Sequence, residues 1–127
     1  MKEEMVFCIT GIDYNEIRDL EKHGVKTFEL VCADHIAIAQ QLKKGANIFI
    51  VNLSKQDVRP GVEGIAAKVT DIKVDYWRTV PREFDEKELL TARIQTKYLD
   101  EGRIIKEKDF GPGKGIRVSY ETHVLVG

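Results

Sequence analysis

One lysine and two glutamates are the residues whose types and positions best fit acid–base chemistry. Lys26 and Glu29 lie in a short β-prone run, and Glu63 follows a turn at Pro60-Gly61. A lysine that loses water on burial has a lowered pKa and can then act as a base or activate a nucleophile. An ionised glutamate nearby opposes that shift. Two interpretations stay open: a catalytic lysine with a distant carboxylate, or an ordinary Lys–Glu pair on an exposed strand face.

A second set of residues is suited to holding nucleic acid. The single tryptophan, Trp77, is next to Arg78 at the end of a predicted strand, and Arg59 lies in the same stretch of the chain. An exposed Trp77 can stack on an unpaired base, a contact worth about 1–3 kcal/mol. The alternative is that Trp77 packs in or over the core. The nucleic-acid contacts are predicted at Lys26, Glu29, Arg59, Trp77 and Arg78.

The charge is unevenly distributed along the chain. Residues 1–40 hold four basic and eight acidic residues, whereas residues 41–80 hold seven basic and four acidic ones. Residues 103–117 are also basic, with five Lys or Arg against two Asp or Glu. This asymmetry permits a nucleic-acid-binding face without requiring one.

Other motifs point away from metals and cofactors. Cys32 and His35 have ligand-like spacing, and Cys8 or His123 could approach them, but a structural zinc site usually has two such pairs. The segment 111–115, Gly-Pro-Gly-Lys-Gly, lacks the spacing and the following helix of a phosphate-binding P-loop. Neither serine lies in the G-x-S-x-G context of a serine hydrolase. We therefore expect no metal and no cofactor.

The first half of the chain is predicted to alternate short strands with two helices. Residues 5–10 form an apolar, β-prone run, and a helix begins after Asp13 and ends at Gly24. Asp13 can cap this helix, and glycine favours the left-handed conformation at a helix end. The remaining elements of this half are a strand over 26–31, a helix capped by Asp34 over 34–42 and a buried strand over 48–51.

The second half is predicted to be mostly β-structure. Branched residues run through 63–76, alternation of apolar and polar residues marks 89–99, and a closing strand covers 116–126. Turns at 100–103 and 111–115 separate the later strands. Two early helices and at least five strands, joined mainly by hairpins, predict the α+β class with a small, strongly bent sheet or barrel.

Length and composition place the chain among ordinary folded domains. It has 127 residues, 43% of them hydrophobic and 32% charged, with a net charge of −1. One domain over residues 1–127 is expected. The first residues lack the apolar run of a signal peptide, and no stretch approaches the about 20 apolar residues of a membrane span. With Cys8 and Cys32 interpreted as small core residues, we expect a reduced, cytoplasmic protein with no membrane partner.

One motif resembles a known family. Residues 24–31, Gly-Val-Lys-Thr-Phe-Glu-Leu-Val, are similar to the G-x-K-x-x-E-x-R motif of ASCH domains, which belong to the PUA-like superfamily of small β-barrels. Gly24, Lys26 and Glu29 match this motif, and Val31 stands in place of the arginine. Almost the whole chain also resembles an uncharacterised archaeal domain-of-unknown-function family (number 473), which has no assigned activity.

The ASCH resemblance implies a PUA-like barrel whose cleft binds RNA or a modified nucleoside. Some ASCH proteins are amidohydrolases that act on acylated cytidine with a lysine, a threonine and a distant glutamate. Lys26 matches the lysine, Thr27 matches the threonine poorly, and Glu63 is placed as the glutamate by position alone.

Three function hypotheses follow from the residues and the resemblance. The leading one is an RNA- or nucleotide-binding module. The second is a small amidohydrolase that acts on a modified nucleoside, with Lys26 and Glu63 as catalytic groups. The third is a protein-interaction module or homodimer that uses an apolar strand edge and has no ligand.

Overall fold

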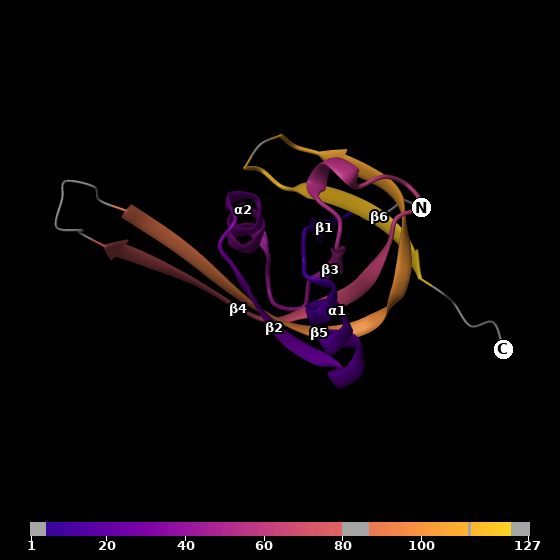
Figure 1. The fold of residues 1–127 in the computed structure, drawn as a ribbon, viewed down its shortest axis with the longest axis horizontal. Coiled ribbons are helices and arrows are strands. Elements are labelled where there is room, and N and C mark those ends of the chain that lie inside the picture. The colour runs from indigo at the N-terminus through magenta and orange to yellow at the C-terminus, as the bar shows by residue number, and fades with distance from the viewer. Residues whose placement is uncertain (1–4, 80–86, 112, 123–127) are drawn as a thin grey trace.

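The computed structural model describes residues 5–79, 87–111 and 113–122, and the side chains of residues 76–90 lie outside the described part. It is a mixed α+β structure with a six-stranded sheet and two α-helices, as predicted (Figure 1). In chain order the elements are β1 (Val6–Ile9), α1 (Tyr14–His23), β2 (Val25–Leu30), α2 (Ala33–Gln41), β3 (Asn47–Ile50), a 3₁₀ turn η1 (Lys55–Asp57), β4 (Glu63–Thr79), β5 (Lys87–Asp109) and β6 (Ile116–Thr122).

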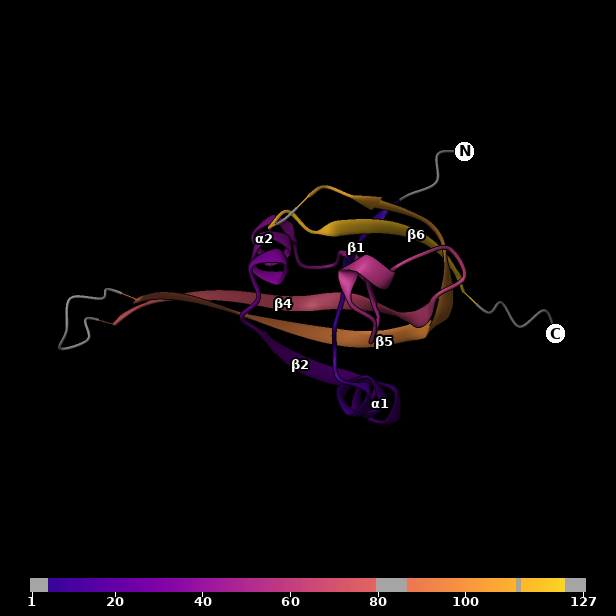
Figure 2. The ribbon, with the colours of Figure 1, turned by 45° about the horizontal axis from the view of Figure 1, so that its top comes forward.

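The sheet closes on itself through its longest strand. The strand order is β2-β5-β4-β3-β1-β6, and β5 also pairs with β6. Hydrogen-bonded pairing therefore runs from β5 to β4, then to β3, β1 and β6, and from β6 back to β5. This closure is feasible because β5 has 23 residues and curves around one side of the molecule, as Figures 1 and 2 show. The β1–β3 pair is parallel, and the other pairs are antiparallel.

Helix α1 forms where the capping signals predict it. The Asp13 carboxylate accepts a hydrogen bond of 2.9 Å from the Asn15 backbone N–H at the first turn. Gly24 ends the helix with a φ of 77°, and its N–H donates to the Leu20 carbonyl at 2.8 Å. Ile17 and Leu20 are buried on the apolar face. The cap, the end and the buried face of this helix are thus confirmed.

Two hydrophobic cores lie on opposite faces of β1 and β3. Phe7 and Ile48 belong to a core that also includes residues of α1, α2 and β2. Cys8 and Phe49, one position further along each strand, belong to a second core with residues of β5 and β6. Because side chains alternate across a strand, a strand buried on both faces appears as an uninterrupted apolar run. Burial on both faces therefore explains why residues 5–10 and 48–51 are apolar without interruption.

The predicted turn at 100–103 is wrong, because β5 continues through this segment. Gly102 pairs with Gly64 of β4 on one side and with Thr122 of β6 on the other. The neighbouring Glu101 and Arg103 are exposed, and the strand continues through them without a reversal of the chain. Charged residues beside a glycine here mark a bend within a strand, so the last strands are longer and fewer than predicted.

The segment around the start of α2 also differs from the prediction. The helix begins at Ala33, one residue before the predicted start, and Cys32 occupies the cap position. Asp34 lies in the first turn of the helix, where its carboxylate contacts other elements of the fold instead of capping the helix. Cys32 is exposed rather than in the core, because the cap lies outside the helix face that buries Ile36.

A glycine pair allows the sheet to bend tightly over Phe49. A Cβ atom added to Gly64 would lie 2.5 Å from the Ile50 carbonyl oxygen and 2.6 Å from the Phe49 ring, and one added to Gly102 would lie 2.7 Å from the Glu121 carbonyl oxygen. Glycine at both positions therefore lets backbones and a buried aromatic ring come into direct contact.

No helix among the described residues is long and apolar enough to cross a membrane.

Candidate functional site

Lys26 lies on the partly buried face of β2. Its side chain is 20% exposed, and its Nζ is 3.6 Å from an Asp19 carboxylate oxygen and 5.8 Å from the centre of the Phe28 ring. Phe28 and Leu30, on the same face, are buried. Lys26 therefore shares a face with apolar residues, and its ammonium already has a carboxylate partner.

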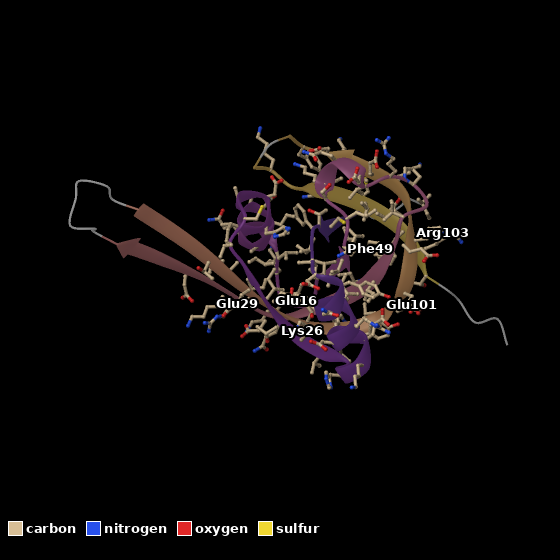
Figure 3. The ribbon with its side chains drawn as sticks, in the orientation of Figure 1. Glu16, Lys26, Glu29, Phe49, Glu101 and Arg103 are labelled. Atoms are coloured by element: carbon tan, nitrogen blue, oxygen red, sulfur yellow. The ribbon has the colours of Figure 1, made fainter. Side chains whose placement is uncertain are left out.

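Glu29 lies on the opposite, exposed face of β2 and pairs with Arg93 of β5. The Arg93 Nε is 3.0 Å from a Glu29 carboxylate oxygen, and both side chains are more than half exposed. Lys26 and Glu29 thus belong to different faces and bind different partners, and Figure 3 shows both on β2, away from Glu101 and Arg103 at the bend of β5.

Lys26 of β2 and Glu63 of β4, the two residues predicted as a catalytic pair, are paired with widely separated positions of β5. Lys26 pairs with Thr96, whereas Glu63 pairs with Arg103. Seven residues of strand correspond to roughly 23 Å. Glu63 lines a different cavity of about 200 Å³ together with Glu21 and Glu101. The structure does not bring Lys26 and Glu63 together.

The other predicted nucleic-acid contacts are dispersed. Arg59 is exposed in the turn before β4, where its carbonyl accepts a hydrogen bond of 3.2 Å from the Val62 N–H. The backbones of Trp77 and Arg78 pair with Leu89 and Glu88 of β5, and their side chains lie outside the described part of the chain. The described residues of this set therefore do not form a single cluster.

The cysteines and histidines considered as metal ligands are also separate. Cys8 is buried, and burial raises the pKa of its thiol to about 12. Burial lowers the pKa of His35, while a backbone hydrogen bond at Thr10 acts in the opposite direction. His123 lies outside the described residues. Within the described ranges, no three His, Cys, Asp or Glu residues are arranged to hold a metal ion.

A lysine that the sequence did not single out joins three elements on the α2 side of the molecule. The Lys55 side chain, from η1, is 15% exposed, and its Nζ lies 3.0 Å from Asp109 and 3.4 Å from Asp34. It also donates a hydrogen bond of 2.8 Å to the Gly111 carbonyl. We call these four residues the Lys55 latch. The latch attaches the β5–β6 loop to α2 and η1, and the Asp34 carboxylate also accepts from the Gly115 N–H at 3.4 Å.

The loop fixed by this latch forms one wall of a pocket. The cavity has about 270 Å³, opens to solvent and is lined by Phe7, Ala37, Gln41, Phe110, Gly113, Lys114 and Arg117. We call it the loop pocket. A second cavity of about 370 Å³, with Asp34, Lys55 and Asp109 in its lining, adjoins it at Gly113. The two cavities therefore flank the same loop.

Arg117 is the most unusual residue of the loop pocket. Its guanidinium carbon is 4.4 Å from the centre of the Phe7 ring and 5.6 Å from that of Phe110. Its Nε is buried and has no hydrogen-bond partner among the described residues. A buried donor without a partner is destabilising by about 1–3 kcal/mol, and by more for a charged group. A ligand oxygen reaching this N–H would relieve that penalty.

The loop pocket was missed from the sequence because its residues come from distant segments. Phe7 belongs to β1, Ala37 to α2, and Arg117 to β6. One signal did point to it, namely the basic character of residues 103–117, which include Lys114 and Arg117. That signal gave no indication of the aromatic residues that surround the arginine.

Protonation of Asp109 in the Lys55 latch is expected to make the stability of the protein depend on pH. A backbone hydrogen bond from Gly111 and the Lys55 ammonium lower the pKa of Asp109 below its ordinary value of 3.8. A lowered pKa contributes stability above the unfolded value, and the contribution is lost as pH falls through the folded value. We therefore expect the melting temperature to fall below about pH 3.8, by less in Asp109→Asn than in the unaltered protein. Thermal unfolding followed by circular dichroism at several pH values measures this, with Glu107→Gln as control. Parallel curves for Asp109→Asn and the unaltered protein would contradict it.

Comparison with known proteins gives a family but no activity. Residues 4–118 match the model of a family described as "Protein of unknown function (DUF473)". An uncharacterized protein of Methanocaldococcus jannaschii is 31% identical over 104 residues, which are 80% of this chain and 65% of that protein. The chain thus spans slightly less than two thirds of the length of this relative. No solved structure matches the chain. The matched range includes the residues that line the loop pocket.

Proposed function

Because the chain belongs to the family of proteins of unknown function DUF473, whose description assigns no activity, we propose from its structure that it is an RNA- or nucleotide-binding module. The proposal rests on the loop pocket. There the buried Arg117 Nε has no hydrogen-bond partner among the described residues, and the guanidinium carbon lies 4.4 and 5.6 Å from the centres of two phenylalanine rings.

The chemistry of the loop pocket suits a phosphate next to a base. Arginine hydrogen-bonds to phosphate with charge-assisted geometry, and the buried Arg117 Nε would gain a partner if the side chain shifted to meet a phosphate in the pocket. Lys114 adds a second positive charge at the edge of the pocket. Phe110 is 40% exposed, and the Lys108 ammonium lies 5.4 Å from the centre of its ring. A base that stacks on this ring would take the place of the lysine side chain.

The strand pairings support a PUA-like architecture for this module. Five strands pair in a ring, from β5 through β4, β3, β1 and β6 back to β5, as a small closed barrel requires. We include this barrel in the proposal. The contacts predicted at Lys26, Glu29, Arg59, Trp77 and Arg78 remain predictions outside the loop pocket, and Lys26 with Glu63 remains a prediction for an amidohydrolase.

Titration of short single-stranded RNA and of nucleoside monophosphates tests the proposal. We expect Arg117→Gln to weaken binding by about tenfold or more, because a charge-assisted hydrogen bond is worth about 1.5–3 kcal/mol. The slope of affinity against salt should decrease by about one for RNA, since one phosphate contact is lost. Arg117→Lys keeps the charge but lacks the planar guanidinium, so its affinity should lie between that of the unaltered protein and that of Arg117→Gln. Fluorescence anisotropy at two salt concentrations measures both quantities.

Arg103→Gln is the matched control, because Arg103 is also an arginine but lies at the bend of β5, five residues before Lys108, which pairs with Arg117. Its Nε is 3.5 Å from a Glu121 carboxylate oxygen, and its side chain is 51% exposed. We expect this variant to bind like the unaltered protein. If no RNA or nucleotide binds at low salt, or if Arg117→Gln binds as well as Arg103→Gln does, the proposal is wrong.

A further inference from the structure

The ends of β4 and β5 nearest their connecting loop form a ribbon that extends away from both cores (Figures 1 and 2). Strand β2 pairs with β5 as far as Ala92, which lies opposite Val74, and beyond that point the ribbon has two strands. Before the ribbon starts, β4 has a backbone partner on its outer edge: Val69 exchanges hydrogen bonds of 2.7 and 2.8 Å with Gly45 and Ala46. A β-bulge between Val69 and Asp71 follows. Beyond it, residues 71–79 of β4 pair with β5 alone within the described chain. We call residues 71–79 the free edge.

A ribbon of this kind is incomplete as a folding unit. An isolated two-stranded hairpin is marginally stable in water, and an unpaired strand edge presents a row of N–H and C=O groups ready to pair with another strand. Short strands and inward-pointing charges normally prevent such pairing. The free edge is nine residues long, and its fourth residue, the apolar Val74, is 37% exposed. This edge is therefore open to pairing.

The charges of the ribbon indicate what kind of partner it accepts. Residues 71–79 and their partners 87–95 hold three acidic and four basic residues: Asp71, Asp75, Glu88, Lys73, Arg78, Lys87 and Arg93. Arg93 is already paired with Glu29 of β2 at 3.0 Å. A polyanion requires an excess of positive charge, and the remaining charges of the ribbon are balanced. A second copy of the same ribbon requires only that opposite charges face each other across a two-fold axis.

We propose that the free edge pairs antiparallel with the free edge of a second copy, with Val74 on the two-fold axis. A two-fold axis perpendicular to a sheet keeps each residue on its own face, so paired positions must have the same parity. With Val74 opposite Val74, Lys73 lies opposite Asp75 twice. Sliding one copy by two residues in either direction opposes Lys73 to Lys73 or Asp75 to Asp75, which is destabilising. The result is a continuous sheet that runs through both copies.

A single cysteine at the proposed axis tests the register. Directly opposite Cα atoms of an antiparallel pair are about 4.5–5.5 Å apart, within the range that a disulfide spans. In a Cys32→Ser background, we expect Val74→Cys to form a covalent dimer on mild oxidation, even in dilute protein. Val25→Cys is the control, because Val25 is a 63% exposed valine on β2. Equal cross-linking of both variants, or none of Val74→Cys, overturns the proposed pairing.

A charge exchange tests the same register without a covalent bond. Lys73→Glu places like charges opposite each other twice, so we expect the dimer dissociation constant to rise by about tenfold. Adding Asp75→Lys restores opposite charges and should restore the affinity. Sedimentation equilibrium of the full chain measures the constants. A monomer at every concentration, or a double variant as weak as Lys73→Glu, overturns the proposal. Both outcomes are independent of whether the loop pocket binds RNA, since none of Lys73, Val74 and Asp75 lines that pocket.

Discussion

Replacing Gly64 with alanine is expected to lower the free energy of unfolding by about 3 kcal/mol, at the upper end of the usual effect of overpacking. The added Cβ atom would lie 2.5 Å from the Ile50 carbonyl oxygen, 2.6 Å from the Phe49 ring and 2.8 Å from Val51 Cγ1. The first of these neighbours is backbone of a central strand and the other two belong to buried side chains, so none can yield without disturbing the second core.

Urea denaturation measures this loss, and Lys68→Ala is the control. Lys68 is exposed on the same strand, so this control introduces the same residue at a position with space around it. It should change stability by less than about 0.5 kcal/mol. Alanine at a strand position is otherwise slightly favourable relative to glycine. A Gly64→Ala protein as stable as Lys68→Ala would therefore show that β3 and β4 are further apart than the structure has them.

Replacing Lys55 with methionine is expected to lower the free energy of unfolding by about 2 kcal/mol. The change keeps the aliphatic stem but leaves Asp34, Asp109 and the Gly111 carbonyl without their shared donor. The Asp34 side chain is only 22% exposed, so water compensates it incompletely, whereas Asp109 is half exposed and loses less. The loop that carries Phe110 and Lys114 would also lose its attachment, so nucleotide affinity should fall as well.

Lys44→Met provides a matched control for this experiment. Its Nζ is 3.2 Å from Asp71, but the two side chains are 72% and 47% exposed. Exposed ion pairs contribute about 0.2–1 kcal/mol, so this variant should lose much less stability than Lys55→Met. Chemical denaturation of both proteins, followed by nucleotide titration, separates the stability effect from the binding effect. Equal losses for the two variants would mean that the Lys55 latch is an ordinary surface contact.

The parts of the fold set by local rules could be predicted from the sequence. The Asp13 cap and the Gly24 end of α1 depend on residues within a few positions of each other. The strands around Cys8 and Phe49 were identified as apolar runs, and the two cores explain why those runs are uninterrupted. The α+β class followed from the order of these elements.

The parts set by contacts between distant segments could not be predicted in this way. The charged residues around Gly102 have the composition of a turn, and only pairing with β4 and β6 shows that they belong to a continuous strand. Lys55 looks like any lysine of a polar loop until α2 and the β5–β6 loop are placed beside it. For Arg117 the sequence indicates a basic neighbourhood, whereas the aromatic rings and the missing hydrogen-bond partner appear only in three dimensions.

The pairing of β1 with β6 has a consequence for how the chain reaches its native state. Val6 is paired with Val118, so the contact that closes the ring joins residues at nearly the greatest separation that the described chain allows. Domains dominated by such non-local contacts fold in milliseconds to seconds rather than microseconds. On the ribosome, β1 and β3 can pair early, but β1 has no neighbour on its other side until residue 118 has emerged. The apolar edge of β1 is thus exposed for most of synthesis, which makes this strand the segment most in need of protection from aggregation during translation.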